Sequence, residues 1–128
     1  MITEDYVSFE TAKLLKDKGF NSDSGDTSRF YLPNGNERWK YGHYHDFDIK
    51  DRIECPTLQM AMKWLREVHN LVIQVEFIDF LEHGEVWLYS IIERNTIKRL
   101  TYRDEDFTEH SYEKACEAAI KYCLENLI

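Results

Sequence analysis

The 128-residue sequence lacks several features that mark special classes of protein. It has only 2 prolines and 5 glycines, so it is neither a linker nor a low-complexity protein. No run approaches about 18 consecutive apolar residues, so we expect no helix that spans a membrane. The first residues carry acids instead of the basic region that opens a secretory signal, which predicts a cytoplasmic protein.

Cysteine is scarce and its number is odd, with no Cys-x-x-Cys pattern among Cys55, Cys116 and Cys123. Neither a disulfide framework nor a structural zinc site is therefore indicated. Cys116 and Cys123 fall in an apolar stripe, where cysteine acts as a small buried hydrophobe. Cys55 precedes a predicted helix, which lowers a thiol pKa, but the neighbouring Glu54 opposes this effect. We expect a structural role for all three.

Basic residues are few, with 16 Lys and Arg against 24 Asp and Glu, and the net charge is −8. An acidic surface repels phosphate backbones, so a nucleic-acid partner is not expected, although a protein that mimics DNA would share this charge. Hydrophobic residues make up 43% of the chain. A chain of this size and composition can bury a core that offsets its ordering entropy, which predicts a single folded domain over residues 1–128.

Apolar residues at helical spacing predict three helices. The first covers residues 9–18 and ends at Gly19 in a Schellman motif, with the next side chain folded back on the helix. The second covers residues 58–69 and ends at Asn70. The third starts after the capping residue Ser111 and runs to the last residue. The expected buried stripe of the second helix is Leu58, Ala61, Met62, Leu65 and Val68.

Alternating patterns predict five strands. They cover residues 29–33, 36–41, 71–77, 85–93 and 97–102. A two-residue turn at Asn34-Gly35 would place Phe30 opposite Trp39 and Tyr31 opposite Arg38.

The strand at 71–77 should place Leu71, Ile73, Val75 and Phe77 on one face, with Gln74 and Glu76 on the other. The strand at 85–93 is apolar on both faces, which favours a central position. Residues 42–54 and 103–109 are expected to be irregular. The order is helix, two strands, helix, three strands, helix, which predicts an α+β domain with an antiparallel sheet of about five strands.

Three segments carry a resemblance to known proteins. They are ETAKLLKDKG at 10–19, PTLQMAMKWLRE at 56–67 and YEKACEAAIKYCLE at 112–125. In these segments the chain resembles a group of short uncharacterised proteins of bacterial phages, prophages and other mobile elements. The resemblance spans most of the length and is densest in the two later segments. The matched motifs are structural, so it implies a mobile-element origin and no site residue.

The segment at 42–51 is the best candidate for chemistry. His43 and His45 point the same way on an extended segment, and Asp46 and Asp48 follow closely, so these four residues can share a divalent cation. They define one hypothesis, a small metal-dependent hydrolase. The segment departs from the His-x-His-x-Asp-His motif of metallo-hydrolases, because Phe47 stands where that motif has Asp. The simpler interpretation is a solvated loop, and no other cofactor is indicated.

A second hypothesis concerns the one basic stretch of the chain. Its members are Arg94, Lys98, Arg99 and Arg103. With Trp87 and Tyr89 on the preceding strand, it could bind single-stranded nucleic acid by stacking and charge. The alternative is the solvent face of an outer strand, where basic side chains discourage edge pairing.

Aromatic residues are in excess, with 8 Tyr, 7 Phe and 3 Trp. A core of this size cannot hide all of them, and exposed ones such as Tyr31, Tyr44 or Tyr89 would form a partner surface. No motif specifies a reaction. The leading hypothesis is therefore a non-enzymatic accessory or protein-interaction domain of mobile-element origin. Its partner could be another protein or a second copy of the chain in a homodimer.

Overall fold

A computed structural model describes residues 2–21, 29–39, 52–80 and 84–128 of the chain. Its helices are α1 (Phe9–Asp17), α2 (Leu58–His69) and α3 (Tyr112–Tyr122), with a 3-10 turn at η2 (Glu105–Phe107) and a π-helical turn at η3 (Cys123–Leu127). Its strands are β1 (Arg29–Tyr31), β2 (Glu37–Trp39), β3 (Ile53–Glu54), β4 (Leu71–Phe80), β5 (Gly84–Glu93), β6 (Lys98–Arg99) and β7 (Thr108–Glu109). The α+β class is as predicted.

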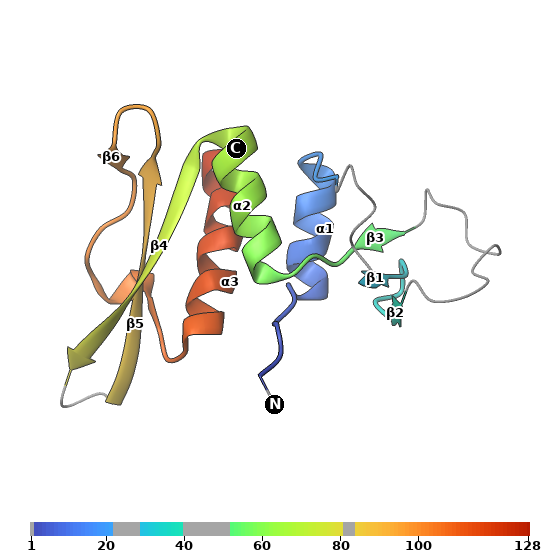
Figure 1. Cartoon of the computed structure of the whole chain (residues 1–128), viewed down its shortest axis with the longest axis horizontal. Coiled ribbons are helices and arrows are strands. Elements are labelled where there is room, and N and C mark those ends of the chain that lie inside the picture. Colours follow the sequence, from blue (N-terminus) through green and yellow to red (C-terminus); the bar gives the residue numbers. More distant parts are fainter. Residues whose placement is uncertain (1, 22–28, 40–51, 81–83) are drawn as a thin grey trace.

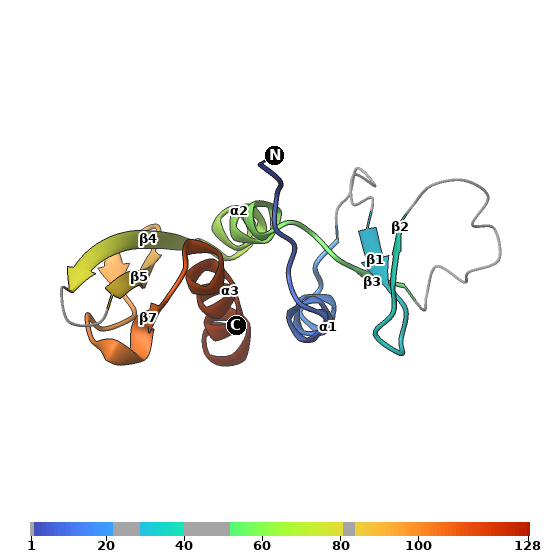
Figure 2. The same ribbon diagram turned by 90° about the horizontal axis from the view of Figure 1, so that it is seen from below.

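The helices lie between two antiparallel sheets (Figures 1 and 2). One sheet has the order β4-β5-β6, with β7 also paired to β5, and the other has the order β2-β1-β3. Helices α2 and α3 cover one face of the β4–β5 hairpin, and α1 lies toward the smaller sheet (Figure 2). In the smaller sheet, β1 pairs with β2 on one side and with β3, formed by Ile53 and Glu54, on the other. These two residues were expected to be irregular.

Local capping explains where α1 and α2 begin and end. The Ser8 hydroxyl accepts a hydrogen bond from the Thr11 amide, and the Thr57 hydroxyl does the same for Met60 at 3.1 Å. Gly19 has φ 90°, and the Phe20 amide donates to the Leu15 carbonyl at 2.9 Å, which is the predicted Schellman closure.

Helix α2 spans the predicted residues and ends at Asn70 in the left-handed region. One part of its predicted stripe is wrong, because Val68 is 57% exposed. The last buried residue of the stripe is Leu65, one turn earlier. Val68 therefore lies beyond the part of the helix that packs on the core.

The β1–β2 turn contains three residues instead of two. The Gly35 amide donates to the Leu32 carbonyl, and the Leu32 amide donates to the Asn36 carbonyl, both at 2.8 Å. Pro33 suits the second position of a type I turn, and Gly35, at φ 90°, supplies the left-handed residue that completes a three-residue hairpin loop. The predicted register is therefore wrong by one residue, and the observed pairs are Phe30 with Arg38 and Tyr31 with Glu37.

The β4–β5 hairpin dominates the larger sheet, with ten residues in each strand. Strand β5 is central, as predicted, because it pairs with β4, β6 and β7. Strand β6 is shorter than predicted, and the segment expected to be a loop at 103–109 contains η2 and β7. None of the helices in the described ranges has the length and apolar character needed to cross a membrane.

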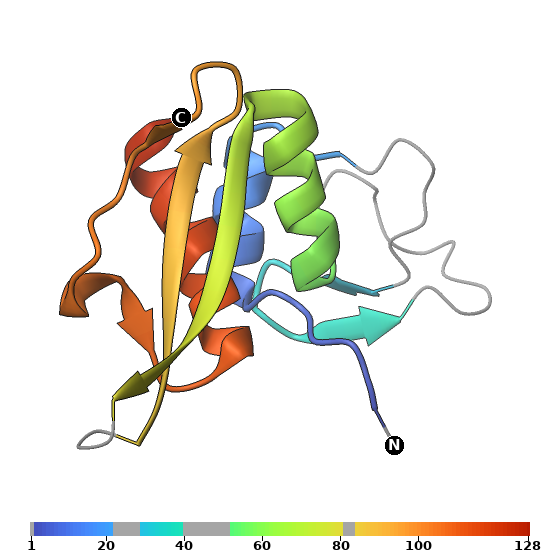
Figure 3. The same ribbon diagram turned by 60° about the vertical axis from the view of Figure 1, so that its left-hand side comes forward.

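The hairpin projects beyond the helices at one end (Figure 3). We call residues 71–75 and 89–93 the proximal half of the hairpin, and residues 76–80 and 84–88 the distal half. In the proximal half, Ile73 and Ile91 form a cross-strand pair on the helix face and belong to the main core. Alternation places the side chains of Ile78, Val86 and Leu88 on the opposite face.

Candidate functional site

The residues of the metal hypothesis, His43, His45, Asp46 and Asp48, lie outside the described residues. The hypothesis that they hold a cation stays a prediction. Within the ranges that the structure does describe, no three His, Cys, Asp or Glu side chains are grouped so as to hold a metal ion.

All three cysteines are fully buried. Burial raises the pKa of the Cys116 thiol and raises that of Cys123 to about 12. Both thiols are therefore protonated at neutral pH and unsuited to nucleophilic attack. The Cys55 thiol donates to the Val7 carbonyl at 3.3 Å, a partner that the sequence did not reveal. The structural role predicted for the cysteines agrees with their burial.

The arginines of the basic stretch are engaged with protein groups. Arg103 pairs with Glu76 at 3.0 Å, and Arg94 lies 3.5 Å from Glu67. The guanidinium of Arg99 donates to the Ser90 hydroxyl and to the Thr101 carbonyl. The two ion pairs offset the positive charge of Arg94 and Arg103 that a nucleic-acid backbone would need, so they weaken the nucleic-acid hypothesis.

Two tyrosines expected at the surface are buried instead, and that expectation is wrong for both. The Tyr31 hydroxyl donates to the Val7 carbonyl at 3.1 Å, and the Tyr31 ring packs on Phe9. Tyr89 is only 5% exposed, with its ring edge-on to Phe107, so it cannot stack on a base. Both side chains point from a strand into the core, where the hydroxyl or the ring finds a partner. Tyr44 lies outside the described residues.

Phe77 is the exposed aromatic residue that matters most for the site. The sequence pattern places it on the apolar face of β4 with Leu71, Ile73 and Val75, yet it is 56% exposed. The alternation itself is correct, since Phe77 pairs across the strands with Trp87, and their rings lie 4.9 Å apart. Helix α3 begins at Tyr112 and contacts Trp87, whereas Phe77, its partner on the projecting strand β4, stays exposed (Figure 3).

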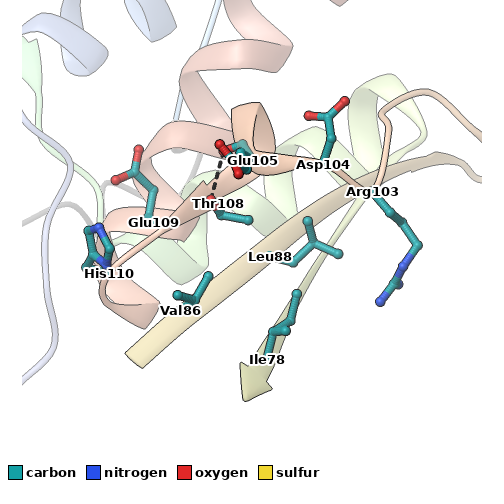
Figure 4. A pocket seen from close by; sticks show the side chains of 9 residues that line it. All are labelled: Ile78, Val86, Leu88, Arg103, Asp104, Glu105, Thr108, Glu109 and His110. Carbon is teal, nitrogen blue, oxygen red and sulfur yellow. Dashed lines mark hydrogen bonds between the residues drawn. The ribbon is translucent and has the colours of Figure 1, made fainter. Parts of the chain in front are cut away.

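A pocket of about 710 Å³ opens on the far face of the distal half (Figure 4). Its apolar floor consists of Ile78, Val86 and Leu88, and its wall is the segment at 103–110. The wall residues at the pocket are Arg103, Asp104, Glu105, Thr108, Glu109 and His110. We call this site the distal pocket.

Local hydrogen bonds shape the wall of the distal pocket. The Asp104 carboxylate accepts from the Asp106 amide at 3.0 Å and caps η2. The Thr108 hydroxyl donates to the Glu105 carbonyl at 2.8 Å (Figure 4). Thr108 also pairs with Leu88 across β7 and β5, which fixes the wall against the floor. The pocket is therefore a preformed feature of the sheet and not an open stretch of loop.

The wall of the distal pocket carries mainly negatively charged side chains. The charge of Arg103 is neutralised by Glu76 at the rim. Asp104, Glu105 and Asp106 are exposed, and no Lys or Arg among the described residues forms an ion pair with them. Behind the wall, burial raises the pKa of Tyr89, and the carboxylates of Glu109 and Asp106 raise it further. An apolar floor thus meets a negatively charged wall.

Sequence reasoning missed the distal pocket. The apolar character of residues 85–93 on both faces indicates a central strand, but it does not reveal a pocket. The acidic run at 104–106 was assigned to a loop. Nothing in the sequence shows that this run folds back along β5, because a two-residue strand such as β7 has no periodicity to detect.

Comparison of the chain with models of protein families, with curated proteins and with solved structures finds no match. The resemblance to proteins of phages and other mobile elements stays a prediction.

Proposed function

We propose that the protein is a non-enzymatic accessory domain that docks a polypeptide partner on the distal half of its β4–β5 hairpin. The observation that carries this proposal is the distal pocket, a preformed cavity with an apolar floor on the projecting end of the hairpin. Three apolar and six polar or charged residues line the pocket. Concave sites that combine apolar side chains with convergent polar groups are typical binding sites.

Both faces of the distal half support the proposal. On the far face, Ile78 on the pocket floor is half-buried, and on the helix face Phe77 presents an exposed ring. The Trp87 ring contacts Phe77 on one side and Tyr112, at the start of α3, on the other. The centroids of Trp87 and Tyr112 are 5.6 Å apart. An exposed aromatic ring beside partly exposed apolar side chains such as Ile78 and Trp87 is characteristic of a protein interface.

The burial of the cysteine thiols and the exposure of most pocket acids favour binding over catalysis. The described cysteine thiols are buried, and the pocket carboxylates Asp104 and Glu105 are exposed, whereas Glu109 is half-buried. Exposed carboxylates lack the desolvation that tunes a catalytic acid or base. The resemblance to proteins of mobile elements supports an accessory role in such an element.

A peptide selection on three forms of the full chain tests the proposal. A displayed library of random short peptides would be panned against the wild type, Ile78→Asp and Val72→Asp. Val72 is the matched control, because it is half-buried on the same strand and the same face but outside the pocket. Circular dichroism and melting temperature establish that each form is folded.

We expect peptides enriched on the wild type to bind Val72→Asp and to lose binding to Ile78→Asp. A carboxylate at residue 78 replaces part of the apolar floor and would lose its water when an apolar anchor docks against it. Two results contradict the proposal: no enriched peptide depends on Ile78, or Val72→Asp loses the same peptides to the same extent.

The metal-dependent hydrolase is the alternative that the sequence raises through His43, His45, Asp46 and Asp48. It predicts that zinc, manganese or magnesium raises the melting temperature of the wild type and leaves a His43→Ala, His45→Ala double variant unchanged. Equal melting curves for the two proteins, with and without metal, contradict it.

A further inference from the structure

We infer that the partner segment is basic, with one apolar side chain on the floor of the distal pocket and Lys or Arg beside its acidic wall. This inference rests on the proposed function, because it names the chemistry of the partner that the distal pocket would dock. It goes beyond that function by predicting which sequences bind and which do not.

The floor selects the anchor. Ile78, Val86 and Leu88 present only hydrocarbon to the cavity, so a polar group placed there would lose its water without gaining a hydrogen bond. An aliphatic or aromatic side chain instead removes apolar surface from water on both partners. The anchor is therefore a residue such as Leu, Ile, Phe or Trp.

The wall selects the flanking residues. Asp104 and Glu105 line the cavity and are exposed, and Glu109 is half-buried next to them. The one arginine of the wall, Arg103, is already paired with Glu76. The wall therefore carries an excess of negative charge that Lys or Arg on the partner can complement. Behind the wall, burial raises the pKa of the Tyr89 hydroxyl, and the nearby carboxylates of Glu109 and Asp106 raise it further.

Charge also decides against other occupants. An acidic peptide or a nucleic acid would bring like charge to the wall. A second copy of this chain carries the same net charge of −8 and is a poor match for the same reason. A basic segment with an apolar anchor is the occupant that both the floor and the wall favour.

The test uses two displayed peptide libraries with the same central apolar position. In one library the flanking positions draw from Lys, Arg, Ser and Gly, and in the other from Asp, Glu, Ser and Gly. Both are selected on the full chain and counter-selected on Ile78→Asp at low salt, with Val72→Asp as the folded control. We expect peptides that depend on Ile78 to come from the basic library and to weaken as salt is added.

The possible failures are distinguishable. Peptides that depend on Ile78 but come equally from both libraries, or chiefly from the acidic one, overturn the inference and leave the proposed function standing. If neither library contains a peptide that depends on Ile78, the proposed function itself fails, and the inference fails with it.

A charge reversal on the wall gives a second readout. Glu105→Lys changes the wall, while Glu4→Lys makes the same change of charge at an exposed residue outside the pocket. The hydrogen bond from Thr108 goes to the Glu105 backbone carbonyl, so the substitution leaves it in place. We expect Glu105→Lys to weaken a basic peptide by roughly tenfold and Glu4→Lys to change its affinity far less. Equal effects of the two substitutions, or no effect of either, overturn the inference.

Discussion

The two halves of the β4–β5 hairpin have the same backbone pairing but different surroundings. The register is continuous through all ten cross-strand pairs, from Leu71 with Glu93 to Phe80 with Gly84. In the proximal half, Ile91 is fully buried in the main core. In the distal half, Phe77 on the same face is exposed. The ladder fixes which face a side chain is on, and the elements packed above that face decide whether the side chain is structural or available for binding.

The difference predicts unequal costs for removing side chains from the two halves. Replacing the buried Ile91 with Ala creates a cavity and should lower the free energy of unfolding by about 2–5 kcal/mol. Replacing Phe77 with Ala loses mainly the edge contact with Trp87 and should cost about 1 kcal/mol. Urea denaturation of the two variants measures both values. Equal costs would mean that the distal half is as well packed as the proximal half.

The proximal half also depends on a buried hydrogen bond. The hydroxyl of Thr101, which is buried, accepts from the Ile91 amide at 3.2 Å. Thr101→Val keeps the shape of the side chain but leaves this amide unpaired, which should cost about 1–3 kcal/mol. Thr101→Ser, which retains the hydroxyl, is the control. The interpretation is wrong if the Val variant is as stable as the wild type in urea while the Ser variant is not.

The turn between β5 and β6, next to the proximal half, contains backbone strain. Ile97 has φ 57°, a left-handed conformation that is unfavourable for a β-branched residue, and its side chain is 80% exposed. Ile97→Gly should raise the free energy of unfolding by about 0.5–1 kcal/mol, because the relief of strain exceeds the entropy that Gly adds to the unfolded chain. A thermal melt measures the gain. A lower melting temperature would show that the Ile97 side chain makes contacts that outweigh its strain.

The smallest predicted effect concerns the same turn and depends on pH. The Glu93 carboxylate accepts from the Thr96 hydroxyl and from the amides of Thr96 and Asn95, and these hydrogen bonds lower its pKa. Because the folded pKa is below the unfolded value, this stabilisation is present above the unfolded pKa and is lost as pH falls through the folded pKa. Glu93→Gln should therefore be less stable than the wild type near neutral pH and should approach it in acid.

Urea denaturation from neutral pH down to pH of about 3, below the ordinary pKa of Glu, measures this convergence. Glu4→Gln, at an exposed position near the start of the chain, is the control. A difference between wild type and Glu93→Gln that stays constant over the whole range contradicts the assignment.

The sequence predicts those parts of the fold that depend on neighbouring residues. Both ends of α2 are correct, because Thr57 and Asn70 act on the backbone within one turn. The predicted β1–β2 register is wrong because Asn34-Gly35 is only part of the turn, and Pro33 also enters the loop.

Burial is less predictable, because it depends on elements far apart along the chain. Val68 and Phe77 continue apolar patterns correctly, yet both lie beyond the core. The distal pocket was not predicted for a similar reason, since it forms only when the segment at 103–110 returns to β5. The α+β class follows from local periodicity, whereas the site follows from tertiary placement.

Methyl NMR tests the central claim most directly. The methyl groups of Ile and Leu would be labelled in the full chain, which is then titrated with a peptide enriched from the basic library. We predict shifts at Ile78 and Leu88, on the pocket floor, and no shifts at Ile73 and Ile91, under the helices. Equal shifts in both halves, or shifts confined to Ile73 and Ile91, would contradict the assignment of the distal pocket as the docking site.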